Sequence, residues 1–207
     1  MGSPAWKCSY YDGSSYTDAP RLNDYHSNGK LLEINDNGDL IMIAGQNNLS
    51  VELLPYGGES WEVISQMDDV HFKNGYYHFS AARLGSKYIY TFGGWAGAGQ
   101  ISGLKNIYKM NMETYEWSVH DQQLIYPRTG IDRTAMVILF LMKYLGHVSL
   151  ARGDFVWHIG GSTNDYVTRW KISEDEESFE VETSAIYIPW WGFYPTAFFV
   201  EEEFSCT

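Results

Sequence analysis

The sequence has little cysteine, little positive charge and no long apolar segment. Its two cysteines, Cys8 and Cys206, stand near opposite ends and lack the spacing of a zinc site. The chain has 14 Lys and Arg against 26 Asp and Glu, a net charge of -12, which disfavours binding to nucleic-acid phosphates. The apolar run at residues 135–142 is far shorter than the roughly 20 residues of a membrane span. We therefore expect neither a nucleic-acid partner nor membrane insertion.

Reactive motifs are also missing from the sequence. It contains no nucleophile elbow, no phosphate-binding loop and no zinc-protease helix. We expect no enzyme activity, no cofactor and no metal site, because the histidines lack metal-ligand spacing (His26, His71, His78, His120, His147, His158). Asn48 begins a glycosylation sequon. Three questions stay open: whether Asn48 is modified, whether Cys8 or Cys206 is free or disulfide-bonded, and in which compartment the protein works.

Aromatic residues are abundant, at 16% of the chain, and they recur in an ordered pattern. The run Tyr88–Phe92 consists of β-branched and aromatic residues and ends at Gly93-Gly94, which predicts a strand buried on both faces. The tract Asp154–Gly161 repeats this order, and a weaker copy ends at Gly45. An alternating strand and then an aromatic residue follow each copy (Trp61, Trp117, Phe179). Such repetition predicts an array of similar units.

The order of apolar run, glycine pair, Tyr and Trp resembles the kelch repeat. The resemblance implies an all-β fold, a partial kelch-type β-propeller with three four-stranded antiparallel blades plus an incomplete fourth. The blades are expected at about residues 30–65, 76–119 and 133–183, and the next begins near 195 with Pro195–Val200. Residues 1–29 are expected to form an irregular lead-in.

The spacing of the copies is uneven. Gly45 and Gly94 are 49 residues apart, and Gly94 and Gly161 are 67 apart, whereas the kelch period is about 50. Aligning Ser80 with Thr134 places the excess at about residues 138–150, between the first two strands of the third blade. This apolar insertion is a functional loop, an additional buried or amphipathic element, or an error in the gene model. We favour the last, because surface loops are rarely so apolar.

The resemblance implies a non-catalytic protein–protein interaction module that is a fragment of a larger protein. Candidate contact segments are the loops 95–103 and 162–166 and the cluster Pro189–Gly192, and Trp95 is either an exposed contact or packed between blades. Propellers have typically four to eight blades, so we expect either a fragment of a longer propeller or association with another chain that completes the ring. The alternative is a small stand-alone β-protein that tolerates an open edge. The alternative function is part of a galactose oxidase-like propeller enzyme whose active-site residues lie outside this chain. No individual binding residue is assigned.

Overall fold

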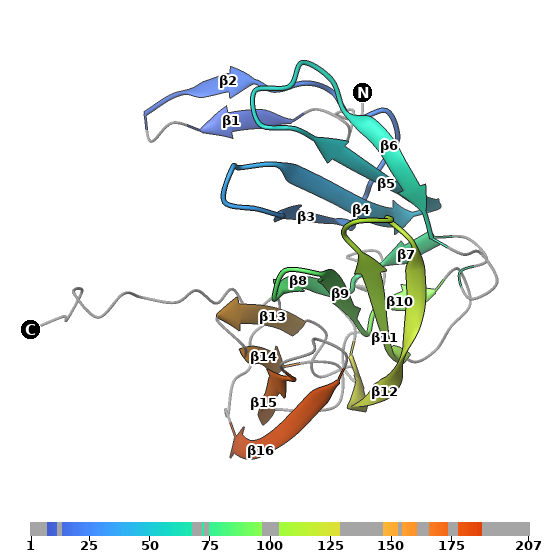
Figure 1. The fold of residues 1–207 in the computed structure, drawn as a ribbon, viewed down its shortest axis with the longest axis vertical. Coiled ribbons are helices and arrows are strands. Elements are labelled where there is room, and N and C mark those ends of the chain that lie inside the picture. Colours follow the sequence, from blue (N-terminus) through green and yellow to red (C-terminus); the bar gives the residue numbers. More distant parts are fainter. Residues whose placement is uncertain are drawn as a thin grey trace, which may run out of the picture.

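The chain forms antiparallel β-sheets (Figure 1). A computed structural model describes the fold over residues 8–11, 14–67, 72, 75–96, 104–128, 147–152, 155–160, 166–173 and 178–187. These residues form strands and turns, and among them no helix could span a membrane. The expected all-β class is confirmed, and none of the described sheets closes on itself.

The first large sheet contains a meander of four antiparallel strands, in which each strand pairs with the next along the chain. Two short strands extend this sheet beyond the end of the second strand, β7 (Gly75–Tyr77) and β10 (Trp95–Ala96). The meander consists of β3 (Lys30–Glu33), β4 (Leu40–Gln46), β5 (Asn48–Leu54) and β6 (Glu62–Gln66).

Two further sheets repeat the same four-strand meander, and each overlaps one of the units expected from the sequence. The second sheet consists of β8 (Ser80–Leu84), β9 (Tyr88–Phe92), β11 (Leu104–Asn111) and β12 (Trp117–Arg128). The third consists of β13 (His147–Arg152), β14 (Phe155–Gly160), β15 (Tyr166–Ile172) and β16 (Phe179–Tyr187).

The third sheet corrects the expected position of the extra residues. β13 pairs with β14 from His147 opposite Gly160 onward, so residues 147–150 belong to a strand and not to an insertion. Val148 precedes Gly160 by 12 residues, much as Ser80 precedes Gly93 by 13. Aligning Ser80 with Thr134 was therefore wrong, because strand pairing and not local composition fixes the register. The remainder of the expected insertion, 138–146, lies outside the described residues, as does the segment 195–200.

The N-terminal segment is more ordered than the irregular lead-in that we expected. It contains the antiparallel hairpin β1 (Ser9–Tyr11) and β2 (Tyr16–Asp18). Residues 20–28, which we call the strap, follow the hairpin. The strap buries the side chains of Leu22 and His26 against the first sheet.

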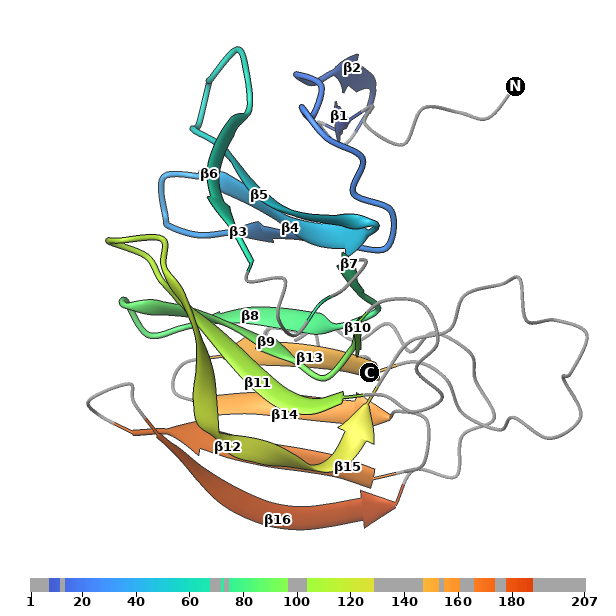
Figure 2. The ribbon, with the colours of Figure 1, turned by 90° about the vertical axis from the view of Figure 1, so that its right-hand side faces the viewer.

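The second sheet lies between the other two and is buried on both faces (Figure 2). Ile89 and Met110 belong to the apolar layer shared with the first sheet, whereas Tyr90 and Phe92 belong to the layer shared with the third. The sequence predicted that β9 is buried on both faces, and this is confirmed, since its residues from Ile89 to Phe92 are all buried. The opening strands also pack together, β3 against β8 and β8 against β13.

Side-chain hydrogen bonds join neighbouring sheets at their outer strands. Ser65 of β6 donates its hydroxyl to the Tyr115 carbonyl at 2.6 Å. Gln122 of β12 donates from Nε2 to the Phe179 carbonyl and accepts the Phe179 N–H on Oε1, both at 2.6 Å. Because the side-chain amide offers the same donor and acceptor as a peptide group, Gln122 links the second sheet to β16 as a backbone bridge would.

The glycine pair after β9 allows two segments to approach closely. Gly94 has a φ of +91°, and a Cβ at this position would lie 2.7 Å from the Phe79 Cβ and 2.8 Å from the Tyr76 ring. These two rings stack with their centroids 4.2 Å apart and their planes 4° from parallel. A side chain at Gly94 would therefore displace a stacked, buried aromatic pair.

We predict that Gly94→Ala lowers the free energy of unfolding by about 2–4 kcal/mol, since left-handed strain and overpacking add. Gly57→Ala is a matched control, because Gly57 also has a positive φ of +71° but no atom within 4 Å of a built Cβ. The control should cost about 1 kcal/mol, from backbone strain alone. Urea unfolding of both variants measures the difference. Equal losses would contradict the role of close packing.

Candidate functional site

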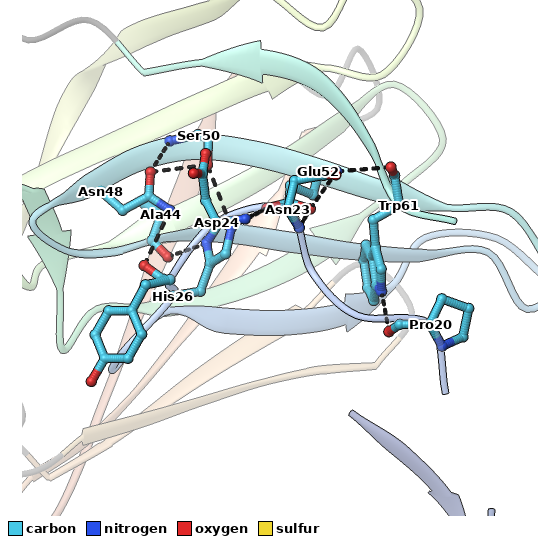
Figure 3. Close-up of polar contacts among 10 residues, drawn as sticks. Pro20, Asn23, Asp24, His26, Ala44, Asn48, Ser50, Glu52 and Trp61 are labelled. Carbon is cyan, nitrogen blue, oxygen red and sulfur yellow. Dashed lines mark hydrogen bonds and ion pairs between the residues drawn. The ribbon is translucent and has the colours of Figure 1, made fainter. Parts of the chain in front are cut away.

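The strap crosses the outer face of the first sheet, which we define as the face pointing away from the second sheet. Leu22 of the strap packs with Leu54 and Trp61 in a small apolar cluster on this face. The Trp61 indole N–H donates to the Pro20 carbonyl at 3.1 Å (Figure 3). The strap is thus held at one end by apolar contact and by a hydrogen bond to its backbone.

Glu52 of β5 lies at the centre of the polar contacts beneath the strap (Figure 3). Its Oε2 accepts the Asn23 backbone N–H at 2.8 Å and the Asn23 side-chain amide at 3.1 Å. Its Oε1 accepts the Asp24 backbone N–H and His26 Nε2, each at 2.8 Å. The Glu52 side chain has no exposed surface, so these four donors replace the water that an ionised carboxylate requires.

His26 connects Glu52 to the end of β4. Its Nδ1 lies 2.7 Å from the Ala44 carbonyl oxygen, and its Nε2 faces the Glu52 carboxylate. The Ala44 carbonyl can only accept, so Nδ1 carries a proton, and a second proton lies between Nε2 and the Glu52 carboxyl group. His26 and Glu52 form a fully buried, hydrogen-bonded pair that fastens the strap to two strands.

A serine beside this pair suggests a Ser-His-Glu triad, but the geometry does not fit. In such a triad the acid and the nucleophile occupy opposite ring nitrogens, and the histidine takes the proton of the serine. Here Ser50 Oγ lies 3.4 Å from Nε2, the nitrogen already bonded to Glu52, while Nδ1 faces a backbone carbonyl. Ser50 instead donates to Asn48 Oδ1 at 2.9 Å. The cluster is a structural anchor and does not activate a nucleophile.

The contact between His26 and Ala44 has a counterpart one unit further along the chain. The Tyr76 hydroxyl donates to the Gly93 carbonyl at 2.7 Å, as His26 does to Ala44. The two donors are 50 residues apart, and the two acceptors are 49 apart. Ala44 and Gly93 both have positive φ, of 45° and 64°. We call each arrangement a corner: a positive-φ residue near the end of the second strand or just after it, whose carbonyl accepts a hydrogen bond from a buried side chain.

Backbone contacts around the two corners also match. Two residues after Ala44, Gln46 donates its N–H to the Ser27 carbonyl at 2.8 Å. Two residues after Gly93, Trp95 pairs in the same way with Tyr77. The residues just before each opening strand, Asn28 and His78, have φ values of 60° and 55°.

The sequence position that corresponds to Tyr76 in the third unit is Tyr144, outside the described residues. Burial raises the pKa of Tyr76 well above its ordinary value, so its hydroxyl stays a donor at neutral pH.

The contact segments expected from the sequence fall mostly outside the described residues, which omit 97–103, 162–165 and 189–192. Trp95 is described, and it is half-buried, with its ring edge-on to Tyr77 of the first sheet at 6.1 Å between centroids.

His120 and His158 are buried between the second and third sheets among aromatic rings. Asn48 uses its side-chain amide within the fold, where it accepts from Ser50 and donates to the Tyr25 carbonyl.

Sequence reasoning missed Glu52 and gave His26 no role, although the two side chains form an extensive set of polar contacts on the first sheet.

Comparison with models of protein families and with curated proteins finds no match for this chain. In the part of the chain that the structure describes, no three His, Cys, Asp or Glu side chains gather where they could share a metal ion.

We predict that Glu52→Gln lowers the free energy of unfolding by about 2–5 kcal/mol, because an amide accepts at one oxygen only and its NH₂ group would face buried donors that lose their acceptor. The exposed Glu59 supplies the control, and Glu59→Gln should change stability by less than about 0.5 kcal/mol. Urea unfolding measures both values, and hydrogen exchange of the Asn23 and Asp24 amides reports whether the strap opens. An unchanged midpoint for Glu52→Gln would show that the pair does not hold the strap.

Cys8 packs against the apolar cluster under the strap. Burial, and after it the negative charge of Glu52, raise the pKa of the Cys8 thiol. The raised pKa leaves less of the reactive thiolate at a given pH. In a Cys206→Ser chain, we therefore expect iodoacetamide to alkylate Cys8 several-fold more slowly at pH 8 in the folded state than in urea. Equal rates in the two states would contradict this environment.

Proposed function

We propose that this chain is a non-catalytic protein-interaction module built as a partial kelch-type propeller. The observation that carries the proposal is the repeated corner, in which His26 and Tyr76 bind the carbonyls of Ala44 and Gly93 at matching places in successive units. Three consecutive four-strand meanders with neighbouring opening strands support the same architecture. In a propeller such meanders are the blades.

The packing of the units suits a scaffold. Apolar layers and the Gln122 and Ser65 hydrogen bonds hold the sheets together, and the buried polar cluster at Glu52 is used to anchor the strap. Turns and loops on such a frame are positioned for binding, as in other repeat proteins. The net charge of -12 favours partners of opposite charge. Association with another chain to complete the ring belongs to the same proposal.

We predict that the purified chain forms a stable complex of fixed stoichiometry with a protein partner. Affinity capture would supply candidates, and each candidate would be purified and titrated against the chain by calorimetry. Sedimentation of the chain alone would show whether it first pairs with a second copy. The control is the same chain unfolded in urea and immobilised. If no purified candidate binds the folded chain more tightly than the unfolded chain, the proposal is wrong.

A further inference from the structure

Two exposed apolar side chains lie at opposite edges of the outer face of the first sheet. Strand register aligns Leu31, Met42, Glu52 and Val63 in one row across the four strands. The strap covers the middle of this row, while Leu31 and Val63 at its two ends are more than half exposed.

A hollow of about 380 Å³ opens at the end of this face where the β3–β4 and β5–β6 turns meet. The ring of Tyr56 is 78% exposed and lies against Gly38, where a Cβ would be 2.9 Å from the ring. The Tyr56 backbone N–H donates to Asp39 Oδ1 at 2.7 Å, which joins the β5–β6 turn to the β3–β4 turn. The hollow is lined by Gly38, Leu40, Leu54, Pro55, Tyr56, Gly57 and Gly58.

Negative charge surrounds this hollow. Four acidic residues belong to the two turns or their flanking strand ends: Glu33, Asp36, Asp39 and Glu59. Glu33 is paired opposite Leu40, and Asp39 adjoins two lining residues, Gly38 and Leu40. Hydrogen bonds from the Tyr56 backbone and the Asn35 side chain lower the pKa of Asp39, so its carboxylate stays ionised. Arg83 from β8 lies 3.7 Å from the exposed Asp36 carboxylate and offsets part of this charge.

We propose that this hollow binds an arginine or lysine side chain of a partner protein, flanked by aliphatic residues in an extended segment. An exposed aromatic ring attracts a cation at its face. The methylene stem of the same side chain can cover Leu40, Leu54 and Pro55 while its charged head stays near the carboxylates of Glu33 and Asp39. An acidic segment of a partner would be repelled by these carboxylates. The inference rests on the proposed function and adds the chemistry of the partner.

Two short capped peptides test this inference with the full chain. The first is acetyl-Gly-Leu-Arg-Leu-Gly-amide, and the second has Glu in place of Arg. We expect the Arg peptide to shift the amide resonances of Gly38, Leu40, Tyr56 and Gly57 saturably, with an affinity that falls as NaCl is added. The Glu peptide should bind at least tenfold more weakly. Equal binding of both peptides, or shifts confined to other surfaces, would overturn the inference.

Matched variants localise the binding. Tyr56→Ala should weaken the Arg peptide at least fivefold while the remaining amide spectrum is unchanged, because the ring is mostly outside the core. Glu33→Gln should weaken it less, and Glu62→Gln should have no effect, since Glu62 pairs with Leu53 of the inner face. Unchanged binding in Tyr56→Ala overturns the proposed site. If a partner binds the chain but the Arg peptide does not, this inference alone fails, whereas the absence of any partner refutes the proposed function.

Discussion

The hydrogen bond from a buried side chain to the corner carbonyl is the interaction on which the arrangement depends. Ala44 and Gly93 take positive φ values where the second strand ends, and their carbonyls point to His26 and Tyr76. A buried carbonyl without a partner costs about 1–3 kcal/mol. Each donor lies in the segment that leads into the first strand of the same sheet. The corner thus fixes where that segment enters its sheet, and the Tyr76 corner also joins the second sheet to the first, because β7 belongs to the first sheet.

Two different side chains perform this task, with different consequences for their surroundings. Tyr76 binds the corner carbonyl of Gly93 with its hydroxyl, and the rest of its ring is apolar and stacks on Phe79. His26 brings a second polar nitrogen, and the structure supplies Glu52 to receive it. That carboxylate then gathers the backbone N–H groups of Asn23 and Asp24. The strap on the outer face therefore follows from the use of histidine at the first corner.

The sequence predicted the strands better than the polar contacts between them. The unbroken aromatic and β-branched run at Tyr88–Phe92 indicated burial on both faces, because no exposed side could tolerate it. Which strands pair could not be deduced from composition in the same way. The alignment therefore matched Ser80 with Thr134, whereas the strand pairing matches it with Val148. The Glu52 anchor was invisible, since its donors lie 26 to 29 residues away in a segment of ordinary polar composition. The hollow at Tyr56 escaped notice because it needs two turns side by side, and neither turn is unusual alone.

The two-sided burial of the middle sheet has a consequence for biosynthesis. The first sheet emerges from the ribosome before its neighbour and can cover the face that carries Ile89 and Met110. The opposite face, with Tyr90, Phe92 and Ile107, packs against side chains of the third sheet, which are translated later. During that interval the nascent chain displays an aromatic face to solvent or to a chaperone. Premature termination after β12 would make the exposure permanent and convert a folding intermediate into an aggregation-prone product.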